Sequence, residues 1–100
     1  MRVMTGAAAA PREWEDDVQA GPGGAMTDEV GVITGPLTLR TVEQEGDSVR
    51  FDVQYKDADE WYTLTGSPRP HHGDPDSLHR AALAAVRTGG GAQAPEGGGA

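Results

Sequence analysis

The chain has 100 residues, a formal net charge of −8 and no cysteine. A chain of this length forms one domain at most, and its small core has to be stable without disulfides. The negative field repels nucleic acids and anionic lipids, and no apolar run approaches the length of a membrane span, so we expect neither kind of partner. Residues 1–12 contain an early arginine and several alanines but lack the hydrophobic centre of a signal peptide, so we expect a cytoplasmic protein.

Both ends of the chain are poor in core-forming residues. Residues 1–25 and 89–100 are rich in alanine, glycine and proline, and neither shows a helical or strand periodicity. Glycine at this density costs backbone entropy that needs compensating burial, so we predict two disordered tails around a folded domain at 26–88. Trp14, which lies in an acidic patch of the first tail, is interpreted as a lone aromatic.

Met26 directly precedes the first apolar run and follows two glycines. Pairs of glycine codons can encode a purine-rich ribosome-binding sequence upstream of a start codon. We therefore hypothesise that translation begins at Met26, and that residues 1–25 come from a start site placed too early. Mass analysis of the N-terminus of the native protein tests this hypothesis.

Alternation and β-branched content predict three strands, at 37–42, at 49–56 and from 60 or 61 to 65. Residues 30–34 are a candidate fourth strand. Gly31 weakens that candidate, and Pro36 cannot donate a hydrogen bond to a strand ladder.

A helix is predicted at 75–88. Asp74 can cap its N-terminus, Pro75 suits the first helical position, and Asp76 places a carboxylate in the first turn. Apolar residues then recur at helical spacing, which leaves Arg80 and Ala84 on the opposite, solvated side.

These elements predict an α+β fold. A three-stranded antiparallel meander, or a four-stranded one if 30–34 joins it, packs one face against the single C-terminal helix. The other face of the sheet stays free for a partner. The expected core consists of the inward-facing residues of these elements, namely Leu37, Leu39, Val49, Phe51, Val53, Tyr55, Tyr62, Leu64, Leu78, Ala82, Ala85 and Val86.

The length of one loop decides which face Trp61 occupies. Residues 57–60 make a four-residue hairpin connection, which sets Lys56 opposite Trp61 and Tyr55 opposite Tyr62. Directly opposed residues share a face, so Tyr62 joins the core and Trp61 points outward beside Lys56. A slip of one residue would reverse both assignments.

The outer face of the predicted sheet combines Trp61 with Arg40, Arg50 and Lys56. Tryptophan and arginine dominate binding hot spots because they bury a large area and keep a polar group. Our leading hypothesis is a small cytoplasmic, non-enzymatic module without a cofactor that binds a protein partner, or itself as a homodimer, through this face. The alternative is a solvated face on which Lys56 stacks against Trp61 as a cation–π pair.

Three histidines suggest a second functional hypothesis. His71, His72 and His79 lie close in sequence to Asp74 and Asp76, and imidazole and carboxylate groups can bind zinc or nickel or act as general bases. A metal-binding or histidine-dependent enzyme site is therefore the alternative function. The spacing matches no structural zinc pattern, the cap explains Asp74, and His79 is interpreted as a surface residue, so we expect no metal and no enzyme.

Overall fold

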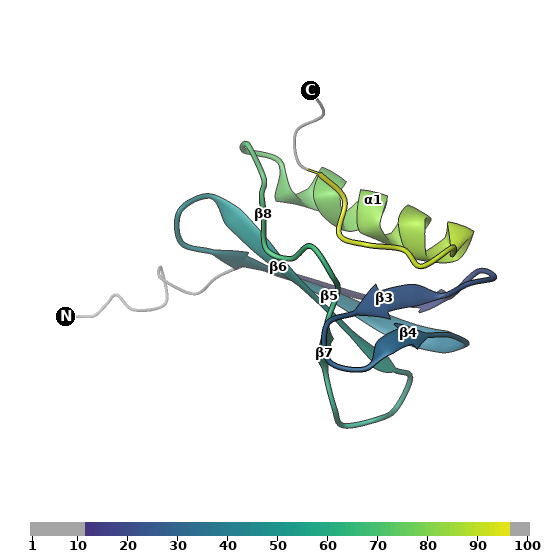
Figure 1. Ribbon diagram of the computed structural model, residues 1–100. Coiled ribbons are helices and arrows are strands. Elements are labelled where there is room, and N and C mark those ends of the chain that lie inside the picture. Colours follow the sequence, from purple (N-terminus) through teal and green to yellow (C-terminus); the bar gives the residue numbers. More distant parts are fainter. Residues whose placement is uncertain (1–11, 97–100) are drawn as a thin grey trace.

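The computed structural model describes residues 12–96, in which one antiparallel sheet carries one helix on one face (Figure 1). The order of the strands across this sheet is β2 (Glu13–Gln19), β5 (Pro36–Gln44), β6 (Ser48–Tyr55) and β7 (Tyr62–Thr63). The short β8 (Arg69–Pro70) also pairs with β6. A separate two-stranded sheet contains β3 (Ala25–Thr27) and β4 (Gly31–Ile33), and the helix is α1 (Pro75–Thr88).

The predicted α+β class, the meander β5-β6-β7 and the single helix over one face are confirmed. Helix α1 begins as expected, because Asp74 Oδ1 accepts a hydrogen bond of 3.1 Å from the backbone N–H of Ser77. Arg80 and Ala84 are exposed. Within residues 12–96, no helix is long and apolar enough to cross a membrane.

The prediction of a disordered N-terminal segment is wrong for residues 13–19. They form strand β2, which pairs with β5 along its whole length, from Glu13 opposite Val42 to Gln19 opposite Pro36. The even-numbered residues of this segment hydrogen-bond to β5, and Val18 enters the core, although the sequence of the segment shows no alternation of apolar and polar residues. Residues 1–11 and 97–100 of the two predicted tails lie outside the described residues.

The second predicted tail is also ordered as far as residue 96, because its glycines contact those of the N-terminal segment. The N–H groups of Gly90 and Gly91 donate to the carbonyls of Pro22 and Gly23 at 2.6 and 2.9 Å. A Cβ atom on Gly21 would overlap the carbonyl oxygen of Arg87. We call this approach of residues 21–24 to 89–91 the glycine contact; it orders both segments together.

The alanine that follows the glycine contact enters the core. Ala92 donates its N–H to Gly24, accepts from Met26 N–H at 2.8 Å and forms a parallel bridge with Ala25. Ala92 and Ala94 are both buried. Burial of these small side chains offsets the backbone entropy that the glycine-rich segment loses when it becomes ordered, and the low-complexity sequence did not indicate this burial.

The register of the β6–β7 hairpin differs from the prediction by two residues. Val53, rather than Tyr55, lies opposite Tyr62, so the connection is longer than the four predicted residues. A shift of two preserves which residues share a face, so Tyr62 still points inward. Tyr55 has lost its predicted partner at the end of β6 and is 43% exposed, which corrects its assignment to the core.

The other predicted core residues are buried, except that Tyr62 and Ala85 are half-buried. The ordered terminal segments, β4 and the helix add side chains to the core: Val18, Ala25, Ile33, Leu83, Ala92 and Ala94. The candidate fourth strand at 30–34 is β4, but it pairs with β3 and does not join the meander. The strand that does extend the meander is β2.

Candidate functional site

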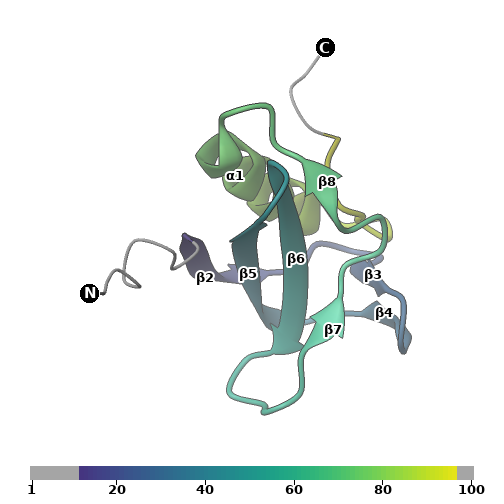
Figure 2. The same cartoon turned by 90° about the vertical axis from the view of Figure 1, so that its left-hand side faces the viewer.

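The candidate surface is the face of the main sheet opposite α1, which we call the outer face. In Figure 2 the upper part of β6 passes in front of the helix, so this view looks onto the outer face. The pairing of β2, β5 and β6 places alternate residues on it. These residues are Glu13, Glu15, Asp17, Thr38, Arg40, Val42, Arg50, Asp52 and Gln54.

Four side chains form a connected group on the outer face, which we call the Trp61 cluster: Arg40, Arg50, Asp52 and Trp61. The guanidinium carbon of Arg40 lies 3.9 Å from the centroid of the Trp61 ring. Asp52 Oδ2 accepts hydrogen bonds from Arg40 Nη2 at 3.1 Å and from Arg50 Nε at 2.9 Å. The side chain of Asp52 is only 9% exposed, so its carboxylate fixes both arginines from beneath.

Lys56 lies outside the Trp61 cluster. Its ammonium group donates to Asp17 Oδ2 at 2.7 Å, and Asp17 also accepts from the Thr38 hydroxyl at 2.8 Å. The hydrogen bond from Lys56, and after it the one from Thr38, lowers the pKa of Asp17. The hydrogen bond to Asp17 in turn raises the pKa of Lys56. The Lys56–Trp61 stack of the alternative interpretation does not form, and Arg40 stacks on Trp61 instead, because the shifted register moves Trp61 away from Lys56.

The predicted basic residues of the outer face, Arg40, Arg50 and Lys56, are not in excess over its acidic residues. Strand β2 adds Glu13, Glu15 and Asp17 to this face, and β6 adds Asp52. The outer face therefore carries at least as many carboxylates as basic side chains. The three basic side chains of the face are each paired with a carboxylate, and Trp61 is half-buried beside them. No pattern in the sequence indicates β2, which supplies most of the carboxylates.

His79 is not a surface residue, because it lies between α1 and the sheet with 2% of its surface exposed. Its Nδ1 is 2.7 Å from the Thr41 hydroxyl, and its Nε2 is 2.7 Å from Asp16 Oδ2. The ring of Trp14 stacks near it, with ring centroids 6.4 Å apart. Trp14 is therefore part of this contact and not the lone aromatic that we expected.

The order carboxylate, imidazole, hydroxyl is that of a nucleophilic triad. Thr41, however, is fully buried at 0% exposure, and it lines neither of the two cavities described below. A hydroxyl in this position cannot meet a substrate. The arrangement of Asp16, His79 and Thr41 instead satisfies a buried imidazole and joins α1 to β2 and β5.

His71 and His72 lie in the segment between β8 and α1. The buried His71 accepts a hydrogen bond at Nδ1 from Gly73 N–H at 2.8 Å, and its Nε2 is 3.3 Å from Glu43 Oε2. Glu43 is also held by Arg12 through two bonds of 2.8 and 2.7 Å, which lower the pKa of Glu43. His72 is exposed.

The three histidines are therefore not brought together, because both ring nitrogens of His79 are occupied at the sheet. Within the described part of the chain, no group of three or more histidine, cysteine, aspartate or glutamate side chains could hold a metal ion. The fold separates the candidates that lay close in sequence, since His71 and His72 precede α1, whereas His79 lies on α1 and faces the sheet.

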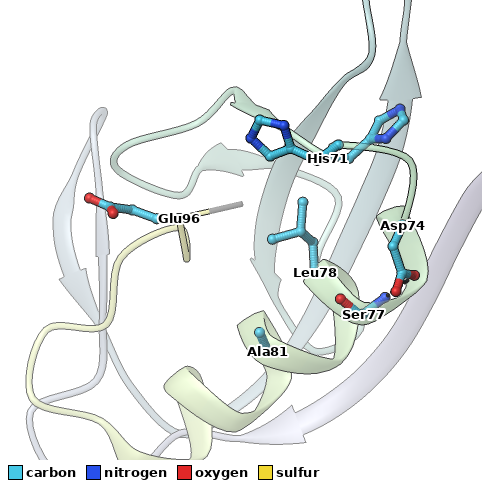
Figure 3. A pocket seen from close by; sticks show the side chains of 7 residues that line it. His71, Asp74, Ser77, Leu78, Ala81 and Glu96 are labelled. Carbon is cyan, nitrogen blue, oxygen red and sulfur yellow. Dashed lines mark hydrogen bonds between the residues drawn. The ribbon is translucent and has the colours of Figure 1, made fainter. Parts of the chain in front are cut away.

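A cavity of about 560 Å³ opens beside the first half of α1 (Figure 3). Its lining includes His71, His72, Ser77 and Leu78, with Asp74 and Glu96 on opposite sides of the view. Asp74 is engaged as the helix cap, and the hydroxyl of Ser77 has no hydrogen-bond partner among residues 12–96. Among the described residues that line this cavity, no hydroxyl is hydrogen-bonded to a base, which is the pairing that activates a nucleophile. A second depression of about 240 Å³ lies at the end of β2 near Lys56.

Comparisons of the chain with protein-family models, with curated proteins and with solved structures each gave no match. The functional argument therefore rests on the geometry of these side chains.

Sequence reasoning selected Trp61, Arg40 and Arg50, which the fold does bring together, but it missed Asp52. The alternation within 49–56 puts Asp52 on the same face as Arg50, but it does not indicate which side chains Asp52 contacts. Its position between two arginines depends on the pairing of β5 with β6, which sets Arg40 opposite Asp52. The residues that face each other across the two strands were the signal that could have identified Asp52.

Proposed function

We propose that the protein is a small, cytoplasmic, non-enzymatic interaction module that binds a protein partner, or a second copy of itself, through the Trp61 cluster. The observation that carries this proposal is the stack of Arg40 on Trp61 above Asp52. Side chains that are already held in place lose little conformational entropy when a partner covers them. Tryptophan and arginine are also the residue types that contribute most at interface centres.

The position of the cluster supports the same proposal. Helix α1 packs on the opposite face of the sheet, so the cluster is not part of the main core. Trp61 is half-buried and Arg50 keeps 39% of its side chain exposed. A partner can therefore reach both an aromatic ring and a guanidinium group.

The alternative function, a metal-binding or histidine-dependent enzyme site at His71, His72 and His79, gains no support from a specific contact. His79 is engaged by Asp16 and Thr41 at its two nitrogens. A zinc or nickel titration followed by histidine NMR shifts still distinguishes the two functions. Saturable shifts of His71 and His72 would favour the alternative.

The direct test of the proposal replaces Trp61 by alanine. We expect Trp61→Ala to remain folded and to weaken association, because the ring lies outside the main core. Self-association is measured by light scattering over a concentration series, and binding of a partner by affinity capture from the native cell with each variant. A species bound by the wild type should be lost with Trp61→Ala.

Tyr55→Ala provides the matched control, because Tyr55 is an exposed aromatic that does not belong to the cluster. It should retain every association that Trp61→Ala loses. If both variants bind as the wild type does, the outer face is only a solvated layer. If Trp61→Ala unfolds the protein, Trp61 is structural and the proposal loses its anchor.

A further inference from the structure

Strand β2 is an edge of the main sheet, since β5 is its only neighbour among residues 12–96. It pairs with β5 over all seven residues without a bulge, and it contains no proline. Natural edge strands are usually short, bulged or interrupted by proline, because a long regular edge can pair with another chain. This edge lacks those three protections and carries charge instead.

Two hydrogen bonds show which backbone groups of β2 point away from the sheet. Glu43 N–H donates to the carbonyl of Arg12 at 2.9 Å, and Ala20 N–H donates to the carbonyl of Gly35 at 3.0 Å. Hydrogen-bonded residues alternate along an antiparallel pair, so the even-numbered residues of β2 bond to β5. The odd-numbered residues direct their N–H and C=O groups outward: Glu13, Glu15, Asp17 and Gln19.

The charges of β2 disfavour a second copy as the occupant of this edge. An antiparallel pair of two β2 strands centred on Asp16 would set Glu15 opposite Asp17 and Asp16 opposite Asp16 of the other copy. Like charges directly opposite each other are destabilising. A strand with lysine or arginine at these positions would instead be attracted, and the net charge of −8 would steer it towards the protein.

The edge also offers a place for one side chain of an added strand. The depression of about 240 Å³ at the C-terminal end of β2 is lined in part by Asp17, Val18 and Gln19. When a peptide adds to a sheet edge, main-chain hydrogen bonds supply affinity and pockets for alternate side chains supply specificity.

We propose that the free edge of β2 binds an extended segment of a partner protein that carries lysine or arginine at alternate positions. The backbone of the segment pairs with the outward groups of Glu13, Glu15, Asp17 and Gln19. Its basic side chains lie on the outer face beside Glu13 and Glu15, neither of which has a side-chain partner among residues 12–96. This surface differs from the Trp61 cluster, so the proposal does not depend on that one.

The experiment uses the full chain and a capped heptapeptide of alternating lysine and valine between terminal threonines. Backbone NMR follows the titration and the rate of amide hydrogen exchange. We expect slower exchange at the outward amides of Glu15 and Asp17, and little change at Trp14 and Asp16, which already bond to β5. The affinity should fall as salt is added.

Two control peptides separate strand addition from simple charge attraction. One has the same sequence with methyl groups on alternate backbone nitrogens, and the other has glutamate in place of lysine. We expect neither to protect the β2 amides. Equal binding by the methylated peptide, binding by the glutamate peptide, or no binding by the basic peptide would each overturn the proposal.

Variants of the protein give an independent test. The double variant Glu13→Gln/Glu15→Gln should bind the basic peptide about tenfold more weakly, since it removes two cross-strand charge pairs. The double variant Glu45→Gln/Asp59→Asn removes the same charge from exposed loops and should bind as the wild type does. Equal loss in both variants would show a diffuse charge effect and contradict a site at β2. Trp61→Ala should bind the peptide normally, which keeps this test separate from that of the Trp61 cluster.

Discussion

His79 Nε2 lies 2.7 Å from Asp16 Oδ2, and this contact joins the helix to an edge strand 63 residues earlier in the chain. The other ring nitrogen meets the buried hydroxyl of Thr41 at 2.7 Å. The imidazole therefore bridges two strands and the helix. Substitutions at Thr41 and His79 therefore measure how much one buried polar contact stabilises a small domain.

We expect Thr41→Val to lower the free energy of unfolding by about 1–3 kcal/mol, because it leaves a buried imidazole nitrogen without a partner. Thr38→Val is the matched control on the same strand, since the Thr38 hydroxyl bonds to the exposed carboxylate of Asp17. Urea unfolding measures both. An equal loss in the two variants would mean that the His79 contact contributes nothing specific.

The double variant Thr41→Val/His79→Leu should recover part of this loss. Replacing both partners of a buried hydrogen bond with apolar groups of similar shape can be nearly neutral. The coupling energy from the double-mutant cycle reports the contact itself. Additive losses would show that the two side chains act independently.

The glycine contact predicts a strong effect of a single methyl group. Gly21→Ala would place a Cβ against the backbone of Arg87 and Thr88, which has to shift to admit it. We expect a loss of about 1–3 kcal/mol, typical of overpacking. Gly46 lies in the β5–β6 turn with open space around it, so Gly46→Ala tests only the energetic cost of an alanine at a positive φ of 80°.

Thermal unfolding compares the two glycine variants. The left-handed conformation costs an alanine about 1–2 kcal/mol relative to glycine, so Gly46→Ala sets the scale for backbone strain alone. Amide signals of Gly90 and Ala92 should shift in Gly21→Ala and stay unchanged in Gly46→Ala. Unchanged signals in both would mean that residues 21–24 and 89–91 do not approach each other in solution.

The hypothesis of a start at Met26 has a structural consequence that can be measured. A chain that begins at Met26 lacks β2 and half of the glycine contact, so the side chains of Leu37, Leu39 and His79 lose a covering strand. We expect this chain to lose cooperative unfolding. A chain that begins at Arg12 keeps β2 and is the control.

Dispersion of the amide NMR spectrum and a thermal melt distinguish these chains. Cooperative unfolding of the chain that begins at Met26 would show that the fold does not need β2, as a native start at Met26 requires. Loss of the fold in that chain alone would make a native start at Met26 incompatible with this structure.

Stability should fall in acid. Glu29 accepts from the backbone N–H and hydroxyl of Thr63, both at 2.7 Å, and these bonds lower its pKa. The pKa values of Asp17 and Glu43 are lowered by Lys56 and Arg12. A depressed folded pKa stabilises the fold above the unfolded pKa of about 4, and this contribution is lost as the pH falls through the folded value.

The urea midpoint as a function of pH measures this effect. Glu29→Gln should be less stable than the wild type at neutral pH, and the difference should shrink as the pH falls below about 4. Glu45→Gln, in the exposed β5–β6 turn, should follow the wild-type curve. A constant gap between Glu29→Gln and the wild type at all pH values would contradict an electrostatic origin.

Local rules in the sequence were sufficient for the helix and for the faces of the meander. Asp74 and Pro75 fixed the start of α1 because a cap and a first-turn proline act within a few residues. The alternation in 49–55 assigned Phe51 and Val53 to the core because the strand pleat has a period of two. The same rule kept Tyr62 inward despite an error of two residues in the register.

Other features depended on contacts between distant parts of the chain. Strand β2 has no β-pattern of its own and is ordered by β5, and two glycine-rich segments become regular only where they meet each other. Trp61 stacks on Arg40, not on Lys56, because the loop before it is longer than its sequence suggested. His79, a surface residue by its local sequence, becomes a buried bridge because β2 covers it.

The sequence by itself determined the fold class, the start of the helix and the inward face of the central strands, since each follows from short-range geometry. Only the tertiary structure decided the ordering of residues 12–25 and 89–96, the partner of Trp61 and the environment of His79. These depend on backbone and side-chain pairs tens of residues apart, such as Asp16 with His79 and Gly21 with Val86, and no periodicity within a single segment encodes such a pair.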